Sequence, residues 1–156
     1  MRAHKSVSSN PAPRIQAIDA NAVIGLAISQ FDQDLSFLQR MFDDASGKLY
    51  TACTYREAMV ELSRERVRVV LCERQLPDGS WKDVLGQLAP ILDRPRLIVI
   101  SRCADEGLWT EVLNMGGFDL LATPLQEVEV AYTVGSACAD WIDERQRSGT
   151  RVLAAC

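Results

Sequence analysis

The fold of this chain is decided by residues 67–79, VRVVLCERQLPDG. The first part is a nearly continuous apolar run rich in β-branched residues, and such a run is typical of a strand that is covered on both faces of a parallel sheet. The run ends at Glu73, and a Leu-Pro-Asp-Gly turn follows it. Because ligands bind at the carboxyl ends of the strands in sheets of this class, the pattern predicts that Glu73 lies at a binding edge.

The composition is that of an ordinary globular domain. The 156 residues are 47% hydrophobic and 24% charged, which is enough chain to form one core. No apolar run approaches the roughly 20 residues that cross a membrane. Residues 1–6 also lack the apolar stretch of a secretory signal. We therefore expect a cytoplasmic protein of one domain that does not enter a membrane.

Charge and residue usage exclude further classes of protein. The formal net charge of −4 comes with no strongly basic stretch, so the attraction that drives nucleic-acid binding is missing. The five cysteines are odd in number and contain no Cys-x-x-Cys pair, which argues against a disulfide framework and a zinc site. His4 is the only histidine, and its place in a predicted tail argues against histidine catalysis. We expect no enzyme activity, no metal and no cofactor.

Strands and helices are predicted to alternate along the chain. Apolar runs predict strands over residues 22–28, 48–52, 67–73, 97–100 and 118–122. Asp32 and Thr54 are predicted N-caps, the first of a helix that ends at about residue 45. Further helices are predicted from Ser80 to about 92 and from Asp105 to about 115, where Gly116 and Gly117 end the helix. The last helix is predicted from Pro124 to about 147. Residues 1–14 are a predicted disordered tail, 15–147 the domain and 148–156 a C-terminal tail. This order predicts an α/β fold, a doubly wound five-stranded parallel sheet with flanking helices.

The residues around Glu73 resemble the phosphoacceptor strand of receiver domains, the response-regulator half of bacterial two-component signalling. In that family an aspartate stands four residues before the proline of a Leu-Pro-Asp-Gly loop, and here Glu73 stands four residues before Pro77. The resemblance covers about residues 15–145 and includes the order of the elements. It implies a (βα)5 receiver fold, which is flavodoxin-like and similar to that of the chemotaxis regulators.

The resemblance also assigns positions to the site. Receivers hold magnesium with an acidic pair after the first strand, and a hydroxyl and a lysine hold the phosphoryl oxygens. At those positions this chain has Ser29 and Gln30, the phosphoacceptor-equivalent Glu73, Ser101 followed by Arg102, and Thr123 before Pro124. Of these residues, only Ser101 is of the type that receivers have at the corresponding position. One carboxylate and no lysine therefore remain where the family has three carboxylates and a lysine.

Two interpretations of Glu73 stay open. In the first, its longer side chain puts a carboxylate where the phosphoryl oxygens of an activated receiver lie, and Arg102 or Arg74 supplies the cation. In the second, the site has decayed and Glu73 is a solvated loop residue or is retained only for structure. Without a metal ion or the lysine, nothing would offset the charge of about −1.5 to −2 on a transferred phosphoryl group, so ordinary phosphotransfer is not expected. The leading hypothesis is a stand-alone pseudo-receiver, a phosphorylation-independent protein-interaction module of phosphorelay signalling.

Two alternatives keep a chemical role for the site. In the first, Asp32 or Asp34 restores magnesium binding in a rearranged acidic site, so that the chain is still a phosphoacceptor; both residues lie about a turn beyond the expected positions. In the second, Cys103 is a thiol sensor, because its place next to Arg102 in a loop at the mouth of the site is typical of a reactive cysteine.

Surplus apolar residues predict where partners bind. Receivers commonly contact partners through their fourth helix, fifth strand and fifth helix, and that face is predicted to include Trp109 and Leu120, the latter where an aromatic switch residue is common. On the last helix we predict two stripes. The core stripe is Leu125, Val128, Ala131, Gly135, Cys138 and Ile142. The exposed seam, which would serve helix pairing, is Val130, Val134, Ala137 and Trp141. The alternative is that both stripes are buried. Expected partners are a histidine kinase, a downstream effector or a second copy through the last helices.

Overall fold

The computed structural model describes Ile15 and residues 23–155, with side chains as far as residue 149. Within this range the strands are β1 (Ile24–Ile28), β2 (Lys48–Ala52), β3 (Val69–Glu73), β4 (Gln75–Leu76), β5 (Gly79–Ser80), β6 (Arg96–Ser101) and β7 (Asp119–Ala122). The helices are α2 (Asp32–Asp44), α3 (Tyr55–Arg64), α4 (Trp81–Leu88), α5 (Glu106–Asn114) and α6 (Glu127–Ala155). The predicted tail over residues 1–14 lies outside the described residues.

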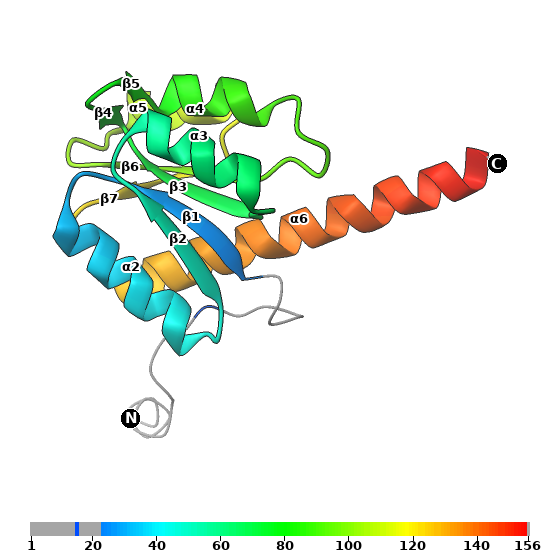
Figure 1. Ribbon diagram of the computed structural model, residues 1–156, viewed down its shortest axis with the longest axis horizontal. Helices are drawn as coiled ribbons and strands as arrows, with labels where there is room; N and C mark the ends of the chain where they lie inside the picture. The colour runs from blue at the N-terminus through cyan, green and yellow to red at the C-terminus, as the bar shows by residue number, and fades with distance from the viewer. Residues whose placement is uncertain (1–14, 16–22, 156) are drawn as a thin grey trace.

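Five of the described strands form one parallel sheet in the order β2-β1-β3-β6-β7. Figure 1 shows helices on both faces, with α3, α4 and α5 on one side and α2 and α6 on the other. This arrangement confirms the predicted doubly wound α/β fold. It also confirms that the decisive stretch forms the central strand β3, which pairs with β1 on one side and β6 on the other.

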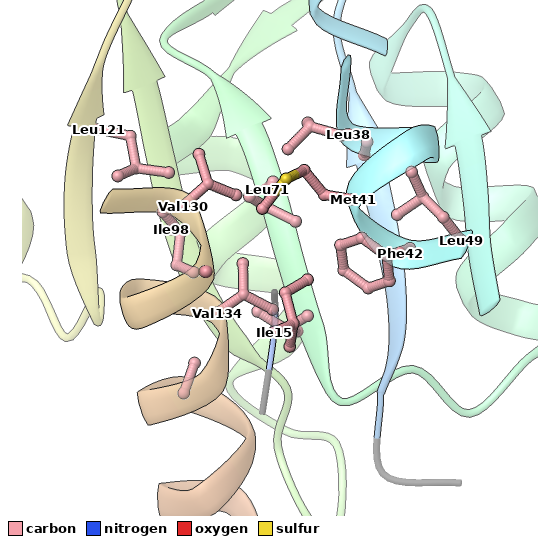
Figure 2. Packing of buried hydrophobic residues seen from close by; sticks show 14 of the residues in the cluster. Ile15, Leu38, Met41, Phe42, Leu49, Leu71, Ile98, Leu121, Val130 and Val134 are labelled. Carbon is pink, nitrogen blue, oxygen red and sulfur yellow. The ribbon is translucent and has the colours of Figure 1, made fainter. Parts of the chain in front are cut away.

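The alternation of side chains along β3 builds both halves of the core. Val69 and Leu71 point toward α2 and α6, whereas Val70 and Cys72 point toward the helices on the opposite face. All five residues of β3 are buried. Figure 2 shows the first half, where side chains of α2, the sheet and α6 meet Ile15. A strand buried on both faces has no polar alternation, which is why the apolar run was diagnostic.

Two of the predicted helix starts are confirmed in atomic detail, and a third is wrong. Thr54 accepts a hydrogen bond from the N–H of Glu57, and Asp105 accepts one from the N–H of Leu108. Asp32 is not an N-cap, because it is already the first residue of α2 and Phe31 holds the cap position. The N–H of Phe31 donates to Ser29 Oγ over 3.0 Å, so a serine hydroxyl in the loop orders this turn instead.

Two helices end at residues other than those predicted. Helix α4 stops at Leu88 rather than near residue 92, and Ile91, just beyond it, is 37% exposed. Helix α6 runs beyond residue 147 to Ala155 and extends away from the sheet, as the red end of the ribbon shows (Figure 1). Of the helices described, none is both long enough and apolar enough to cross a lipid bilayer.

The Leu-Pro-Asp-Gly turn forms a small antiparallel hairpin of β4 and β5 next to the end of β3. The Asp78 carboxylate accepts hydrogen bonds from the N–H groups of Tyr55 and Arg56 at the start of α3. Burial alone would raise the pKa of Asp78, but these N–H donors lower it below its ordinary value. The turn therefore fixes α3 and the loop after β3 relative to each other.

Candidate functional site

The candidate site lies at the carboxyl edge of the sheet, where β1, β3, β6 and β7 end side by side. Register brings its residues together: Glu73 pairs with Ile100, and Ser101 pairs with Ala122. Ser29 follows β1 directly, and its N–H donates to the carbonyl of Ala52. The strand-end positions predicted from the sequence are therefore neighbours at one edge, as parallel strands require.

Glu73 is the last residue of β3 and is only 6% exposed. Its Oε1 atom is buried and has no hydrogen-bond partner among the described residues. Burial raises the pKa of Glu73 to about 7, against the lowering effect of Arg102, and the nearby Asp34 raises it further. The prediction of a solvated loop residue is therefore wrong. Glu73 is an inward-held carboxyl that carries only part of a negative charge at neutral pH.

Among the residues that the structure describes, Arg102 is the cation whose contacts lie at the site, and it binds Asp34 rather than Glu73. One guanidinium nitrogen lies 2.8 Å from Asp34 Oδ2, and another lies 3.4 Å from Thr123 Oγ1. The guanidinium also stacks on the ring of Phe31, 3.6 Å from its centroid. Because the Asp34 side chain is only 9% exposed, this Arg102–Asp34 bridge is a partly buried ion pair. It ties the start of α2 to the loop after β6 and to the end of β7.

Both serine hydroxyls are used by the backbone of their own loops. Ser29 is 1% exposed and accepts from the N–H of Phe31, and Ser101 is 3% exposed and accepts from the N–H of Cys103 over 3.1 Å. Gln30 points to solvent. The hydroxyls thus order the turns that follow β1 and β6, which is the ordinary use of strand-end serines.

Proteins similar to this chain are found among solved structures. No family model and no curated protein matches the sequence. Solved structures do match: the receiver domain of an HD domain-containing protein from Pseudomonas fluorescens Pf-5 is 19% identical over 85% of this chain and 98% of that one, with a TM-score of 0.74. This chain has the receiver-domain fold.

Other receivers match in the same way. The receiver domain of a putative Luxo repressor protein from Vibrio parahaemolyticus is 17% identical over 79% of this chain and 95% of that one, with a TM-score of 0.71. The beryllofluoride-activated NtrC4 receiver domain dimer is 18% identical over 76% of this chain and 98% of that one, with a TM-score of 0.70. At such identities the likeness concerns the fold, and the chemistry of the site must be argued from this chain's own residues.

The charged side chains at this edge of the sheet differ from the set that the resemblance implies. Two carboxyls, Asp34 and Glu73, and one guanidinium are present, and Thr123 stands in a cis peptide bond with Pro124 where the resemblance places a lysine. In the part of the chain that the structure describes, no three His, Cys, Asp or Glu side chains are placed to hold a metal ion. The charged side chains that the structure brings into contact here form one ion pair, Arg102–Asp34.

The residues of the two chemical alternatives differ in their surroundings. Asp34 lies at the site with its carboxylate in the Arg102–Asp34 bridge, whereas Asp32 is exposed at the start of α2. An open pocket of about 370 Å³ adjoins the bridge; it is lined by Gln33, Asp34, Phe37, Arg102, Thr123, Pro124 and Leu125. Cys103 is exposed at the mouth of the site, so the thiol-sensor hypothesis stays a prediction.

The predicted seam on the last helix is wrong, because α6 turns it toward the sheet. Val130 and Val134 are fully buried and Trp141 is 5% exposed, and Figure 2 shows the two valines pointing into the cluster beside Ile98 and Leu121. The indole N–H of Trp141 donates to the carbonyl of Asp93 over 2.8 Å. Val128, which was predicted to be core, is instead 67% exposed.

The other predicted contact residues lie on α5 and β7. Trp109 is 45% exposed and its indole N–H donates to the Asp119 carboxylate, while Leu120 is half-buried. Leu113 on α5 and Met115 just after it, which sequence reasoning missed, are also exposed. These four apolar residues, Trp109, Leu113, Met115 and Leu120, are called the α5–β7 face below.

Two contributors to the site were not foreseen in their actual role. Phe31 was not considered, and Asp34 was considered only as a metal ligand. Both flank the first turn of α2, three residues apart, and such spacing puts them on one side of a helix start. The spacing of Phe31 and Asp34 could have indicated that both contact the same residue. It could not have shown that this residue is Arg102, which lies 68 positions from Asp34 in the sequence.

Proposed function

We propose that the chain is an atypical receiver of two-component signalling that works through protein contacts and without phosphorylation. The observation that carries this proposal is the Arg102–Asp34 bridge next to a buried Glu73, because it engages the site's cation at the position where an incoming phosphoryl group would need it. The receiver fold of the neighbours supports the signalling context. In this function the chain is not an enzyme and uses no cofactor.

The balance of charge supports a site that does not accept phosphate. A phosphoryl group would bring about −1.5 to −2 charges to a site that already holds Asp34 and Glu73. In the described part of the chain, Arg102 is the cation with contacts at the site, and using it to offset these charges would leave the Asp34 side chain, 9% exposed, without its partner. Leaving this partly buried carboxylate without its cation is destabilising, so phosphorylation would oppose the existing structure.

The protonation of Glu73 favours a structural role over mimicry of a phosphoaspartate. A carboxyl with a pKa of about 7 is roughly half protonated at neutral pH, whereas a phosphoryl group carries nearly two charges there. We therefore propose that the Arg102–Asp34 bridge, rather than the charge of Glu73, keeps the loops after β1 and β6 in one state. Mimicry by Glu73 remains the alternative.

The α5–β7 face is the proposed surface for a signalling partner such as a histidine kinase or an effector. Trp109 and Leu113 lie four residues apart on α5 and so share one side of that helix, and partly exposed tryptophans are favoured anchors at protein interfaces. No phosphoryl-driven change is needed for this face to be available, since Trp109 is already 45% exposed.

The test is a titration with magnesium and beryllofluoride, followed by amide chemical shifts. The matched control is a variant with the usual receiver residues restored, combining Ser29→Asp, Gln30→Asp, Glu73→Asp and Thr123→Lys. We expect saturable shifts around β3 and β6 in the restored variant and none in the natural chain. A saturable, magnesium-dependent response of the natural chain would overturn the proposal and restore the rearranged phosphoacceptor.

A further inference from the structure

We propose that a groove at the amino edge of the sheet binds a small anion that carries two or more phosphoryl groups. The groove is open, has a volume of about 610 Å³ and is called the basic groove below; its lining includes Lys48, Tyr50, Arg64, Glu65, Arg66 and Arg68. It lies at the starts of β1, β2 and β3, which in a parallel sheet are on the edge opposite Glu73. Strands β1 and β2 are five residues long, so about 16 Å of strand separate the two edges. This inference therefore goes beyond the proposed function, and either one can fail without the other.

The basic groove carries an excess of positive charge. Among the described residues that line it, four are cations and one is a carboxylate, although the whole chain has a formal net charge of −4. The carboxylate, Glu65, accepts a hydrogen bond of 2.9 Å from the hydroxyl of Tyr50. Cations that are held together repel one another, and a bound anion relieves that repulsion. The groove thus concentrates positive potential on a molecule that is otherwise acidic.

Two of the four cations are available to a ligand. Lys48 and Arg64 are exposed and form no ion pair with a side chain that the structure describes. The Lys48 ammonium instead lies 5.5 Å from the centroid of the Tyr50 ring. Residues 1–22 contain three cations and one acidic residue, Asp19, so the sequence before the sheet adds positive charge rather than offsetting it. An anion from outside the chain is therefore the complementary occupant.

The other two cations differ in how firmly they are held. Arg68 is half-buried, and its guanidinium lies 4.6 Å from the centroid of the Trp141 ring. Arg66 lies 3.1 Å from Asp93, but its side chain is 74% exposed, and exposed ion pairs contribute little to stability. Asp93 also has Arg145 at 3.8 Å. Arg66 can therefore turn to a ligand without leaving this carboxylate unpaired.

The chemistry of the basic groove favours several phosphoryl groups in a short chain. An arginine guanidinium offers parallel N–H donors that match phosphate oxygens, and a lysine ammonium binds phosphate as a point charge. A polyphosphate carries several negative charges over a short length, so it can contact cations of β2 and of the segment between α3 and β3 at once. Pockets of about 300 to 1,000 Å³ are typical of small ligands, and the volume of the basic groove lies within that range.

The charge outside the basic groove disfavours a long polyanion. Because the whole chain is acidic while the groove is basic, the remaining surface is negative on balance. A nucleic acid or a long acidic peptide would extend onto that surface and be repelled there. The half-buried ring of Tyr50 adds an apolar surface to the wall. The polyphosphate is therefore either inorganic or part of a nucleotide whose base contacts this ring.

The first test is a calorimetric titration of the full chain with ATP and with inorganic tripolyphosphate, both free of metal ions. We expect saturable binding of both anions that weakens about fivefold between about 50 and 200 mM salt, because salt screens exposed charges. Tighter binding of ATP that Tyr50→Leu removes would identify a nucleotide, and equal binding an inorganic chain. The inference would be overturned if neither anion saturated the protein, or if a pentaglutamate peptide bound more tightly than both.

The second test compares two matched variants of α3. Arg64→Gln removes a cation from the basic groove, and Arg56→Gln makes the same change at an exposed position near the other end of the helix. We expect Arg64→Gln to weaken binding about fivefold or more and Arg56→Gln to change it less than about twofold, both with an unchanged circular dichroism spectrum. Lys48→Gln should act like Arg64→Gln. Equal weakening by Arg56→Gln and Arg64→Gln would reject the groove as the site.

The third measurement separates the basic groove from the candidate site at the other edge. Tripolyphosphate should move the amide chemical shifts of residues 46–50 and 64–68 and leave those of Glu73 and residues 101–103 unmoved. Movement at the carboxyl edge without movement at the groove would overturn the inference. These titrations contain neither magnesium nor beryllofluoride, so their outcome is independent of the titration that tests the proposed function.

Discussion

Replacing Glu73 with Gln should stabilise the protein at high pH and leave its stability nearly unchanged at low pH. In the folded chain the pKa of Glu73 is raised from its ordinary 4.5 to about 7, chiefly by burial. The folded state therefore binds this proton more tightly than the unfolded state does. Its contribution to the free energy of unfolding is fully present below pH 4.5, falls as the pH rises toward 7, and is lost above that.

The magnitude follows from the same difference. A tenfold change in proton affinity corresponds to about 1.4 kcal/mol, so ionising Glu73 in the folded state costs at most about 3.5 kcal/mol. Because proteins relax around a buried charge, the effective cost is smaller, and we expect about 1 to 3 kcal/mol. A glutamine side chain at this position has no charge to bury. The Glu73→Gln variant should therefore exceed the natural chain by this amount at pH 8 and by almost nothing at pH 4.5.

The assay is urea unfolding of both proteins at half-unit steps from pH 4.5 to 8.5. Comparing the two proteins at each pH cancels the titration of all other groups. Glu106→Gln, which changes an exposed glutamate at the start of α5, is the matched control and should show no such trend. The reasoning would be refuted if the difference in unfolding free energy between Glu73→Gln and the natural chain were the same at every pH, or if Glu73→Gln destabilised the protein at pH 8. Either result would mean that burial does not raise the pKa of Glu73.

Three further changes test the contacts that hold the site and the last helix. Arg102→Gln should lower the free energy of unfolding by about 1 to 2 kcal/mol, because it leaves the Asp34 side chain without its cation. It should also raise the pKa of Glu73 above 7 in a carboxyl carbon NMR titration, and an unmoved midpoint would contradict the lowering effect of Arg102 on Glu73. Trp141→Phe should lose about 1 to 2 kcal/mol in urea unfolding, since it removes the N–H that donates to the carbonyl of Asp93; no loss would mean that this hydrogen bond is unimportant. Thr54→Ala should cost about 1 kcal/mol by removing the cap of α3, whereas Thr54→Ser should restore most of it.

Much of the fold could be predicted from the sequence because its signals are local. The two-sided burial of β3 appears as a continuous apolar run, and the capping hydroxyl of Thr54 and carboxylate of Asp105 lie within three residues of the N–H groups that they bind. Gly116 ends α5 with a φ of 103°, a conformation that glycine adopts without strain. Asp32 failed as a cap because Ser29, three residues earlier, already orders that turn.

The facing of the last helix could not be predicted because α6 carries two apolar stripes. Both repeat at helical spacing, and periodicity alone does not say which of them faces the sheet. The folded chain decides through contacts that are distant in sequence: Trp141 donates to Asp93 and stacks on Arg68, and Arg96 pairs with Asp140. These contacts rotate Val130 inward and leave Val128 exposed.

The site shows the same division between local and distant signals. Its positions at the ends of β1, β3, β6 and β7 followed from the sequence, since each lies directly after an apolar run. The bond between Arg102 and Asp34 did not, because it joins residues 68 positions apart. This bond changes the interpretation of the site, because Arg102, one of the two cations that the mimicry hypothesis assigned to Glu73, is bound to another carboxylate.

The Arg102–Asp34 bridge supports the proposal that this chain works through protein contacts rather than through phosphorylation. A conformational switch requires a ligand that binds two states with different affinity, and the Arg102–Asp34 bridge disfavours the usual ligand. Trp109 on the α5–β7 face is already 45% exposed, so the proposed partner contact would need no such switch.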